Sequence, residues 1–390
     1  MHSLNGLAKC ILVFSMVGGL AGRHCGAQID PEYRELLELG YDQPLVGQGP
    51  PGGYAYLYYN NPGLIHTNIA LRLALAPAYL DGEVGFKQLL SPTTDFGIGL
   101  NGGGYSDDYY EIRQGKYLKA ESFNGDGGGT SASLYQLLNP GMLIPLNLIG
   151  RGRVHYATYD TADQTAGQFN LPQDQVNLFT RTGLRLAGKE PVLYPALGME
   201  LSVWFERQWR LEDDTYGYDN DRRINPAVDL YWLYAGLNYT FTNSGQRISF
   251  ALTAGGSTDA DRFSAWRLGG VLPLVSEFPL VLPGYYYEEL TAQRFVHLYA
   301  AYDIPLDRAQ RFKFRLEAAA ANLDYLPGLE QSPWQTGVGC GLTFSPNKKN
   351  FKVELRYGYG FNAIRNGQEG AQSIGVLFQY DFQAPKRRSD

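Results

Sequence analysis

The sequence predicts an all-β protein: a closed, antiparallel transmembrane β-barrel of about sixteen strands. Three observations carry this prediction. Apolar and polar residues alternate at period two in segment after segment of the 390-residue chain. The connections between these segments fall into short turns and longer polar loops. No stretch offers the run of about 20 apolar residues that a membrane-spanning helix needs.

The alternation is clearest from Thr291 to Phe382, where five strands are predicted. In residues 311–318, Phe312, Phe314 and Leu316 alternate with charged residues, namely Lys313, Arg315 and Glu317. Successive side chains of a strand point to opposite faces, so this strand has one apolar and one charged face. In a soluble sandwich the apolar face forms the core, whereas in an outer-membrane barrel it faces lipid. Alternation by itself fits both.

About eleven further strands are predicted before these five. They begin near Tyr54, Asn68, Gly82, Thr93, Tyr109, Gly129, Ile144, Gln175, Tyr194, Val228 and Arg247.

The lengths of the connections favour the barrel. Short turns are expected at 81–82, 139–141, 188–191, 243–245, 305–309 and 346–350. Longer polar loops alternate with them at 159–174, 210–227, 258–290, 322–333 and 363–370. A barrel with both ends of the chain in the periplasm has short turns inside and long loops outside. A sandwich or propeller has no reason to sort its connections in this way.

The N-terminal residues indicate export. Lys9 precedes an apolar run, and small residues follow at Gly26 and Ala27, so residues 1–27 read as a signal peptide. We expect a short periplasmic segment at 28–52, with room for one small helix, then the barrel at 53–382 and a periplasmic tail at 383–390.

Composition agrees with this class. The 29 tyrosines suit the aromatic girdles of membrane barrels. The mean hydropathy of -0.27 is too polar for a bundle of spanning helices. A net charge of -6 argues against nucleic acid as a partner.

The longest predicted loop contains 261–263 (Asp-Arg-Phe), 267–270 (Arg-Leu-Gly-Gly) and 282–285 (Leu-Pro-Gly-Tyr), and five strands follow it. In these residues it resembles the long external loop of the bacterial surface antigen superfamily, which folds into the lumen. That family contains outer-membrane protein assembly barrels and two-partner-secretion transporters. The resemblance implies a lumenal loop motif made of Arg267, Gly269, Gly270, Pro283, Gly284 and Tyr285. Residues 354–359 and the preceding strand also look like the family's closing hairpin.

The end of the chain is similar to the C-terminal signal that outer-membrane assembly machinery recognises, through Gly375, Phe378, Tyr380 and Phe382. Two departures from the family stand out. Pro283 stands where the family has its lumenal loop arginine. Residues 28–53 hold no periplasmic repeats.

The resemblance and the strand pattern together predict a lumenal charge network that grips the loop. Its expected members are Arg315, Glu317, Glu354 and Arg356. Glu317 matches the family's acidic partner of the loop, and Arg267, Arg315 or Arg356 would pair with it.

Catalytic chemistry finds little support. His155 and His297 are expected to face the lumen, but no motif places a hydroxyl nucleophile such as Ser133 or Ser249 beside them. The acidic residues at 212–221 lack the spacing of a cation site and read as a solvated loop. We therefore predict no catalytic residue, no metal site and no cofactor.

The sequence thus predicts an integral barrel of the Gram-negative outer membrane, with a role in outer-membrane protein assembly or translocation. In that role the first and last strands would meet at a weak seam. The alternatives are a porin-like diffusion channel for small solutes and an accessory barrel that binds a partner. Expected partners are outer-membrane lipid and lipopolysaccharide, the assembly machinery during insertion, and other outer-membrane proteins.

Overall fold

The computed structural model of the protein describes residues 32–50, 52–76, 79–104, 108–188, 197–211, 214–273, 277–346 and 350–383. The predicted signal peptide and nearly all of the predicted C-terminal tail lie outside these residues. No helix in the described ranges is long and apolar enough to cross a bilayer.

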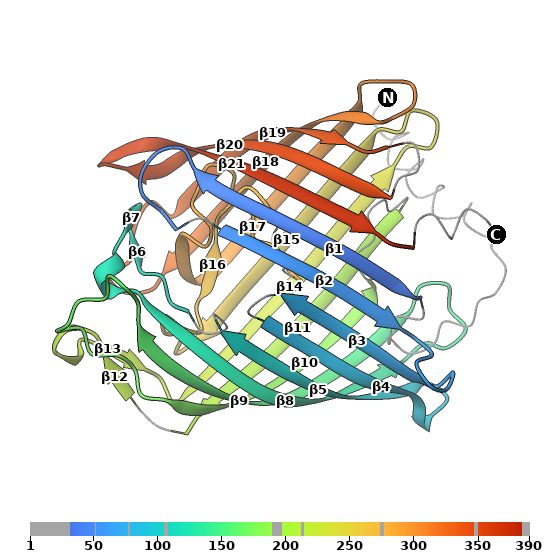
Figure 1. Ribbon diagram of the computed structural model, residues 1–390, viewed down its shortest axis with the longest axis horizontal. Helices are drawn as coiled ribbons and strands as arrows, with labels where there is room; N and C mark the ends of the chain where they lie inside the picture. Colours follow the sequence, from blue (N-terminus) through green and yellow to red (C-terminus); the bar gives the residue numbers. More distant parts are fainter. Residues whose placement is uncertain are drawn as a thin grey trace, which may run out of the picture.

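Sixteen antiparallel strands form one closed barrel in the described chain (Figure 1). Each pairs with its sequence neighbours, and the last pairs with the first. The barrel strands are β1 (Arg34–Pro44), β2 (Gly52–Asn61), β3 (Ile69–Ala76), β4 (Tyr79–Ser91), β5 (Thr94–Gly104), β8 (Phe123–Leu137), β9 (Leu146–Thr161), β10 (Gln175–Ala187), β11 (Leu197–Arg210), β14 (Ala227–Thr240), β15 (Arg247–Thr258), β17 (Leu290–Pro305), β18 (Phe312–Tyr325), β19 (Trp334–Phe344), β20 (Phe351–Arg365) and β21 (Gln368–Asp381).

Short elements decorate the connections. They are β6 (Ile112–Arg113), β7 (Lys116–Tyr117), β12 (Asp214–Tyr216), β13 (Arg222–Ile224), β16 (Trp266–Leu268) and two 3-10 turns, η1 (Lys119–Glu121) and η2 (Tyr218–Asn220). Figure 1 shows the hairpins β6–β7 and β12–β13 together at one end of the barrel, on the left. Most of the short turns lie at the opposite end, whereas the two-residue connection 366–367 between β20 and β21 lies at the same end as β6–β7.

The barrel is inverted relative to a soluble protein. Apolar side chains on its outer face are open to the surroundings: Phe312 is 45% exposed, Leu342 51% and Leu355 49%. Their neighbours on the inner face, including Arg315 and Glu354, are buried. An apolar outside around a polar inside is the pattern of a membrane-spanning barrel. The predicted fold class and the orientation of the faces are confirmed.

The predicted N-terminal boundary is wrong. Residues 34–44 form β1, a full barrel strand, in place of a periplasmic segment with a small helix. Leu37, Leu39 and Tyr41 alternate with Glu38, Gly40 and Asp42, but the three prolines at 44, 50 and 51 hide this short pattern. Pairing with β2 and β21 decides the local structure, because strand formation depends strongly on tertiary context.

Three other details differ from the prediction. The strand expected at Tyr109 is an external connection that carries β6 and β7, so the strand count survives only because β1 replaces it. The predicted turn at 81–82 lies inside β4. The loop expected at 363–370 is a two-residue hairpin at 366–367, since both strands extend further than their apolar alternation does.

The seam between β1 and β21 is as long as the pairing on the other side of β1. Nine residue pairs join the two strands, from Leu36↔Asp381 to Pro44↔Ser373, as many as join β1 to β2. The β2–β3 pairing, with five pairs, is shorter.

Candidate functional site in the barrel lumen

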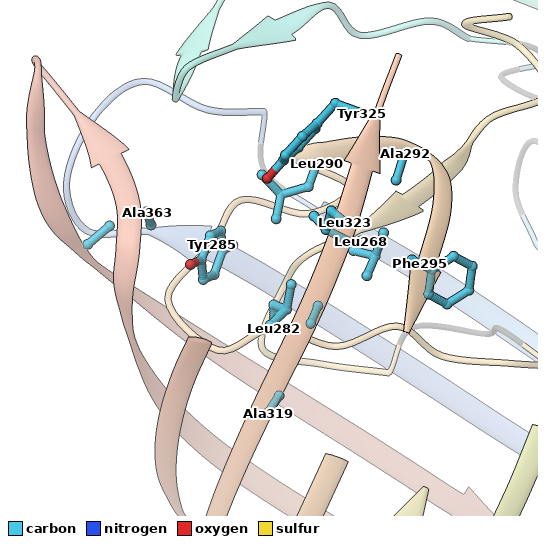
Figure 2. Close-up of a cluster of buried hydrophobic side chains, with 12 residues drawn as sticks. Leu268, Leu282, Tyr285, Leu290, Ala292, Phe295, Ala319, Leu323, Tyr325 and Ala363 are labelled. Atoms are coloured by element: carbon cyan, nitrogen blue, oxygen red, sulfur yellow. The ribbon is translucent and has the colours of Figure 1, made fainter. Parts of the chain in front are cut away.

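The connection from β15 to β17 (the β15–β17 loop, residues 259–289) lies against the inner faces of several strands. Its β16 pairs with the start of β17. The loop then doubles back, because Gly269 N donates to Leu280 O (3.0 Å) and Leu282 N donates to Gly270 O (3.1 Å). Figure 2 shows Leu268, Leu282 and Tyr285 of this loop packed against β17 and β18.

Glycines on β19 and β20 allow the loop to approach the wall closely. A Cβ on Gly337 would lie 2.3 Å from Pro283 O, and one on Gly358 would lie 2.5 Å from Gly284 N. Gly284 itself has φ +90°, and a Cβ there would lie 1.9 Å from Gly360 N. No side chain fits in these spaces. We call this surface, made of Gly337, Gly358 and Gly360, the glycine wall.

Buried polar contacts fix the same part of the loop. Gly284 N donates to Ser373 Oγ (3.1 Å), and His297 Nε2 donates to Val281 O (2.8 Å). Val271 N donates to Asp42 Oδ2 (2.6 Å), which ties the loop to β1. Backbone groups removed from water need hydrogen-bond partners, so these contacts specify one position for the loop.

One buried ionic contact of the loop is bidentate. Arg365 Nη1 and Nη2 donate to the two carboxylate oxygens of Glu289, each at 2.7 Å, and both side chains are buried. Glu289 also accepts from Tyr286 N (2.7 Å), and the Arg365 guanidinium lies 3.5 Å from the centre of the Tyr286 ring. Sequence reasoning missed this pair, because Arg365 had been assigned to a loop.

The predicted charge network exists as a cluster of buried side chains on the inner face. Arg315 contacts Asp303 (2.8 Å) and Glu317 (3.1 Å). Arg356 reaches Glu317 at 3.5 Å. Arg356 also pairs with Glu354, to which Lys352 donates at 2.7 Å. The structure therefore brings together all four predicted network residues, and Arg356 Nη1 also donates to Val271 O of the loop (3.4 Å).

Arg267 does not belong to this network. It donates to Tyr110 O (3.3 Å), and its guanidinium lies 4.8 Å from the centre of the Tyr109 ring. Arg267 as a partner of Glu317 is therefore wrong. Of the other motif residues, Gly269 and Gly270 form the tight bend (φ +143° and +85°), and Tyr285 donates to Gln335 Oε1 (2.7 Å).

Between the charge network and the loop lies a cavity of about 180 Å³. Its wall includes Arg247, Arg315, Lys352 and Arg356 on the barrel and Pro273, Pro279 and Val281 on the loop.

A second part of the inner wall, on β10, β11 and β14, contacts the middle of the loop. Arg181 and Arg185 on β10 lie over the rings of Trp232 and Trp204, with guanidinium-to-ring distances of 5.1 and 5.0 Å. The two indoles stack with centroids 6.0 Å apart. Phe278 of the loop packs against both indoles at 5.8 and 6.0 Å.

The first residues of the loop belong to an aromatic cluster. Phe263 packs with Tyr109, Phe123 and Tyr216, which come from three other segments of the chain.

Beside this cluster lies a buried carboxylate, Glu111. Its partners are Arg113 (2.7 Å), Arg262 (3.1 Å) and Arg222 (3.7 Å). Burial alone would raise the pKa of Glu111, but the guanidinium groups of Arg262 and Arg222 outweigh it and lower the pKa overall.

The residues of the predicted C-terminal signal divide between the two faces. Phe378 pairs with Leu39 across the seam, and the rings of Tyr380 and Phe382 lie 4.6 Å apart. Gly375 faces inward, where a Cβ would lie 2.7 Å from atoms of Val271 and Leu272. Gly375 is therefore also a contact of the loop.

No group of His, Cys, Asp and Glu side chains suited to hold a metal occurs among the described residues. His155 and His297 both point inward, as predicted.

No protein-family model matches the chain. No curated protein matches it either. Solved structures do. CdiB from Escherichia coli has a TM-score of 0.59 at 13% identity, over 90% of this chain and 63% of that one. CdiB from Acinetobacter baumannii has a TM-score of 0.58 at 11% identity, over 90% and 60%.

BamA from Haemophilus ducreyi lacking POTRA domains 1-3 has a TM-score of 0.57 at 9% identity, over 97% of this chain and 78% of that one. The chain thus spans about three fifths of the CdiB structures. At these identities the likeness concerns the fold. The barrel of this protein is therefore similar in fold to those of BamA and CdiB.

Proposed function

We propose that this chain is an outer-membrane barrel for protein assembly or translocation, in which the β15–β17 loop closes the lumen and its displacement opens a path for polypeptide. One observation carries the proposal. The loop contacts opposite parts of the inner wall, reaching β10 and β14 through residues 277–278 and β19–β21 through residues 282–285.

The seam supports a route through the lumen over a route between the first and last strands. Nine pairs join β1 to β21, and opening them would expose two unpaired strand edges to lipid. Unpaired backbone groups in the hydrocarbon region cost several kcal/mol each. Releasing the loop, in contrast, exchanges its contacts for water or for a passing chain within the lumen.

Site-specific photocrosslinking in cells tests the proposal. A crosslinker at Asn238, which lines the lumenal cavity, should capture polypeptide adducts. The matched control is Leu237, the next residue on β14, which faces lipid. Adducts at Asn238 and none at Leu237 support passage through the lumen. Adducts confined to Leu39 on the seam would contradict this route, because they would show insertion between β1 and β21.

Conductance in planar bilayers separates the proposal from a diffusion channel. We expect a low conductance for the intact protein and a marked rise after deletion of residues 271–283. A large steady conductance in the intact protein would identify a porin-like channel, the alternative that the sequence also allowed.

A further inference from the structure

Five side chains of the lumen wall form a concave surface for one short piece of the loop. Arg181 and Arg185 come from β10, Trp204 from β11, and Trp232 and Tyr234 from β14. We call them the aromatic pocket. Their strands are consecutive in the barrel, and all five side chains face inward. The Trp204 indole packs on Gly183, where a Cβ would lie 2.3 Å from the ring.

The occupant of this pocket is the dipeptide Glu277–Phe278 of the β15–β17 loop. The Glu277 carboxylate contacts both guanidinium groups, with 3.4 Å to Arg181 Nη1 and a close contact to Arg185 Nη2. The Phe278 ring lies 5.4 Å from the Tyr234 ring and meets both indoles edge to face. Each half of the dipeptide thus has its own chemical counterpart: two guanidinium groups for the carboxylate and an aromatic cage for the ring. The same guanidinium groups also pair with carboxylates of β11, Arg181 with Glu206 (2.7 Å) and Arg185 with Glu200 (3.1 Å).

The pocket retains binding capacity beyond these contacts. The indole N–H groups of Trp204 and Trp232 are buried and have no acceptor in the described part of the chain. A buried indole normally donates a hydrogen bond. A peptide in extended conformation would offer backbone carbonyls as acceptors at this place.

The occupant is only partly shielded from solvent. Glu277 is 47% exposed, against 37% for Arg181 and 14% for Arg185, so solvent screens the contact with Arg181 more than the contact with Arg185. A second chain with the same two side chains could therefore exchange with it.

We propose that the aromatic pocket is a binding site for polypeptide segments in which an acidic residue precedes an aromatic one, and that Glu277–Phe278 occupies it as an internal mimic. The inference rests on the proposed function in one respect, that the incoming segment belongs to a polypeptide in transit. It names the class of segment that would displace the loop from this wall.

Peptide binding to the purified full chain in detergent tests the pocket. The probe is an acetylated, amidated peptide, Ala-Glu-Phe-Ala, which contains no tryptophan. Binding is followed by tryptophan fluorescence, because Trp204 and Trp232 line the pocket. We expect saturable binding to the double variant Glu277→Ala, Phe278→Ala, and at least about tenfold weaker apparent binding to the unaltered chain, whose own dipeptide competes.

Two controls define specificity. A peptide with Gln in place of Glu should bind at least about tenfold more weakly, since it loses both charge-assisted contacts. The variant Arg181→Gln, Arg185→Gln, made in the double-variant background, should remove the difference between the two peptides. Equal binding of the Glu and Gln peptides, or no saturable signal with the double variant, would overturn the proposal. The peptide comparison needs no change to the pocket and stands even where the arginine variant fails to fold.

The outcome is separable from that of the crosslinking experiment. Peptide binding without polypeptide adducts at Asn238 would refute the proposed function and keep the pocket. Adducts at Asn238 without peptide binding would do the reverse.

Discussion

Two of the ion pairs that hold the β15–β17 loop have opposite character. Arg365 and Glu289, near the glycine wall, are 2% and 0% exposed and meet at two hydrogen bonds. Arg181 and Glu277, in the aromatic pocket, are 37% and 47% exposed. Breaking a buried pair costs about 3–5 kcal/mol, whereas an exposed pair contributes about 0–1 kcal/mol. The loop therefore combines a strong buried contact, Arg365–Glu289, with a weaker exposed contact, Arg181–Glu277, that another chain could replace.

The largest effect should come from Arg365→Met. It leaves the Glu289 carboxylate buried with one backbone donor, so we expect a loss of about 3–5 kcal/mol in the free energy of unfolding. Urea titration in detergent micelles, followed by the gel shift between folded and unfolded barrel, measures this loss.

Glu289→Gln added to Arg365→Met provides the control for this prediction. Removing the orphaned charge should recover part of the lost stability, as a coupled pair does in a double-mutant cycle. Additive losses would mean that the two residues act independently, and the contrast with Glu277 would disappear.

Gly284→Ala should have the next largest effect. The new methyl group would overlap the backbone of Gly360, in addition to the strain of φ +90°. Gly328→Ala is the matched control, because Gly328 has φ +82° with nothing within 4 Å of its Cβ position. We expect Gly284→Ala to lose about 1–3 kcal/mol more than Gly328→Ala, the range typical of overpacking. Similar losses for the two variants would show that the glycine wall tolerates the loop in other positions.

The outer end of the loop should respond to pH. The folded-state pKa of Glu111 is lowered by Arg262 and Arg222, so its contribution to stability is present above the unfolded pKa of about 4.5. It is lost as the pH falls through the lower folded value. Limited proteolysis of residues 108–122 should therefore accelerate between pH 5 and pH 3, both taken as rough limits. Glu111→Gln should flatten this dependence.

Glu277→Gln should have the smallest effect on stability, below about 1 kcal/mol, because the Glu277 carboxylate that contacts Arg181 and Arg185 is itself 47% exposed. The same substitution should change the conductance more clearly than the stability. We expect more frequent channel openings in planar bilayers, since the loop is released from β10. A stability loss comparable to that of Arg365→Met would contradict the division of the loop into a fixed and an exchangeable part.

Much of the fold could be predicted from the sequence because lipid contact enforces a strict pattern. Phe312, Leu316 and Leu342 must point outward for the barrel to insert, and period two records this directly. β1 is missed because its alternation is limited to residues 37–42, it ends at a proline, and one of its two neighbours lies more than 300 positions away. Such pairings leave little local signal.

The site could be predicted only in part. Charged residues within clear strands, such as Arg315 and Glu354, were placed correctly on the inner face. The sequence could not show which wall residues contact which residues of the loop. These contacts depend on the path that the long connection takes through the lumen. Gly337 and Gly358 did carry a signal: glycines alternating with large apolar residues left one face of two strands without side chains, the space that the loop enters.

The register of β1 against β21 constrains the order of biogenesis. Leu36 meets Asp381, so the ring is completed only when β21 has been synthesised and pairs with β1. Until then the nascent sheet has two free edges, each able to pair with foreign strands. A chain shortened by the final fourteen-residue strand would keep those edges for good and should be cleared by proteolysis, whatever the quality of the rest of its wall.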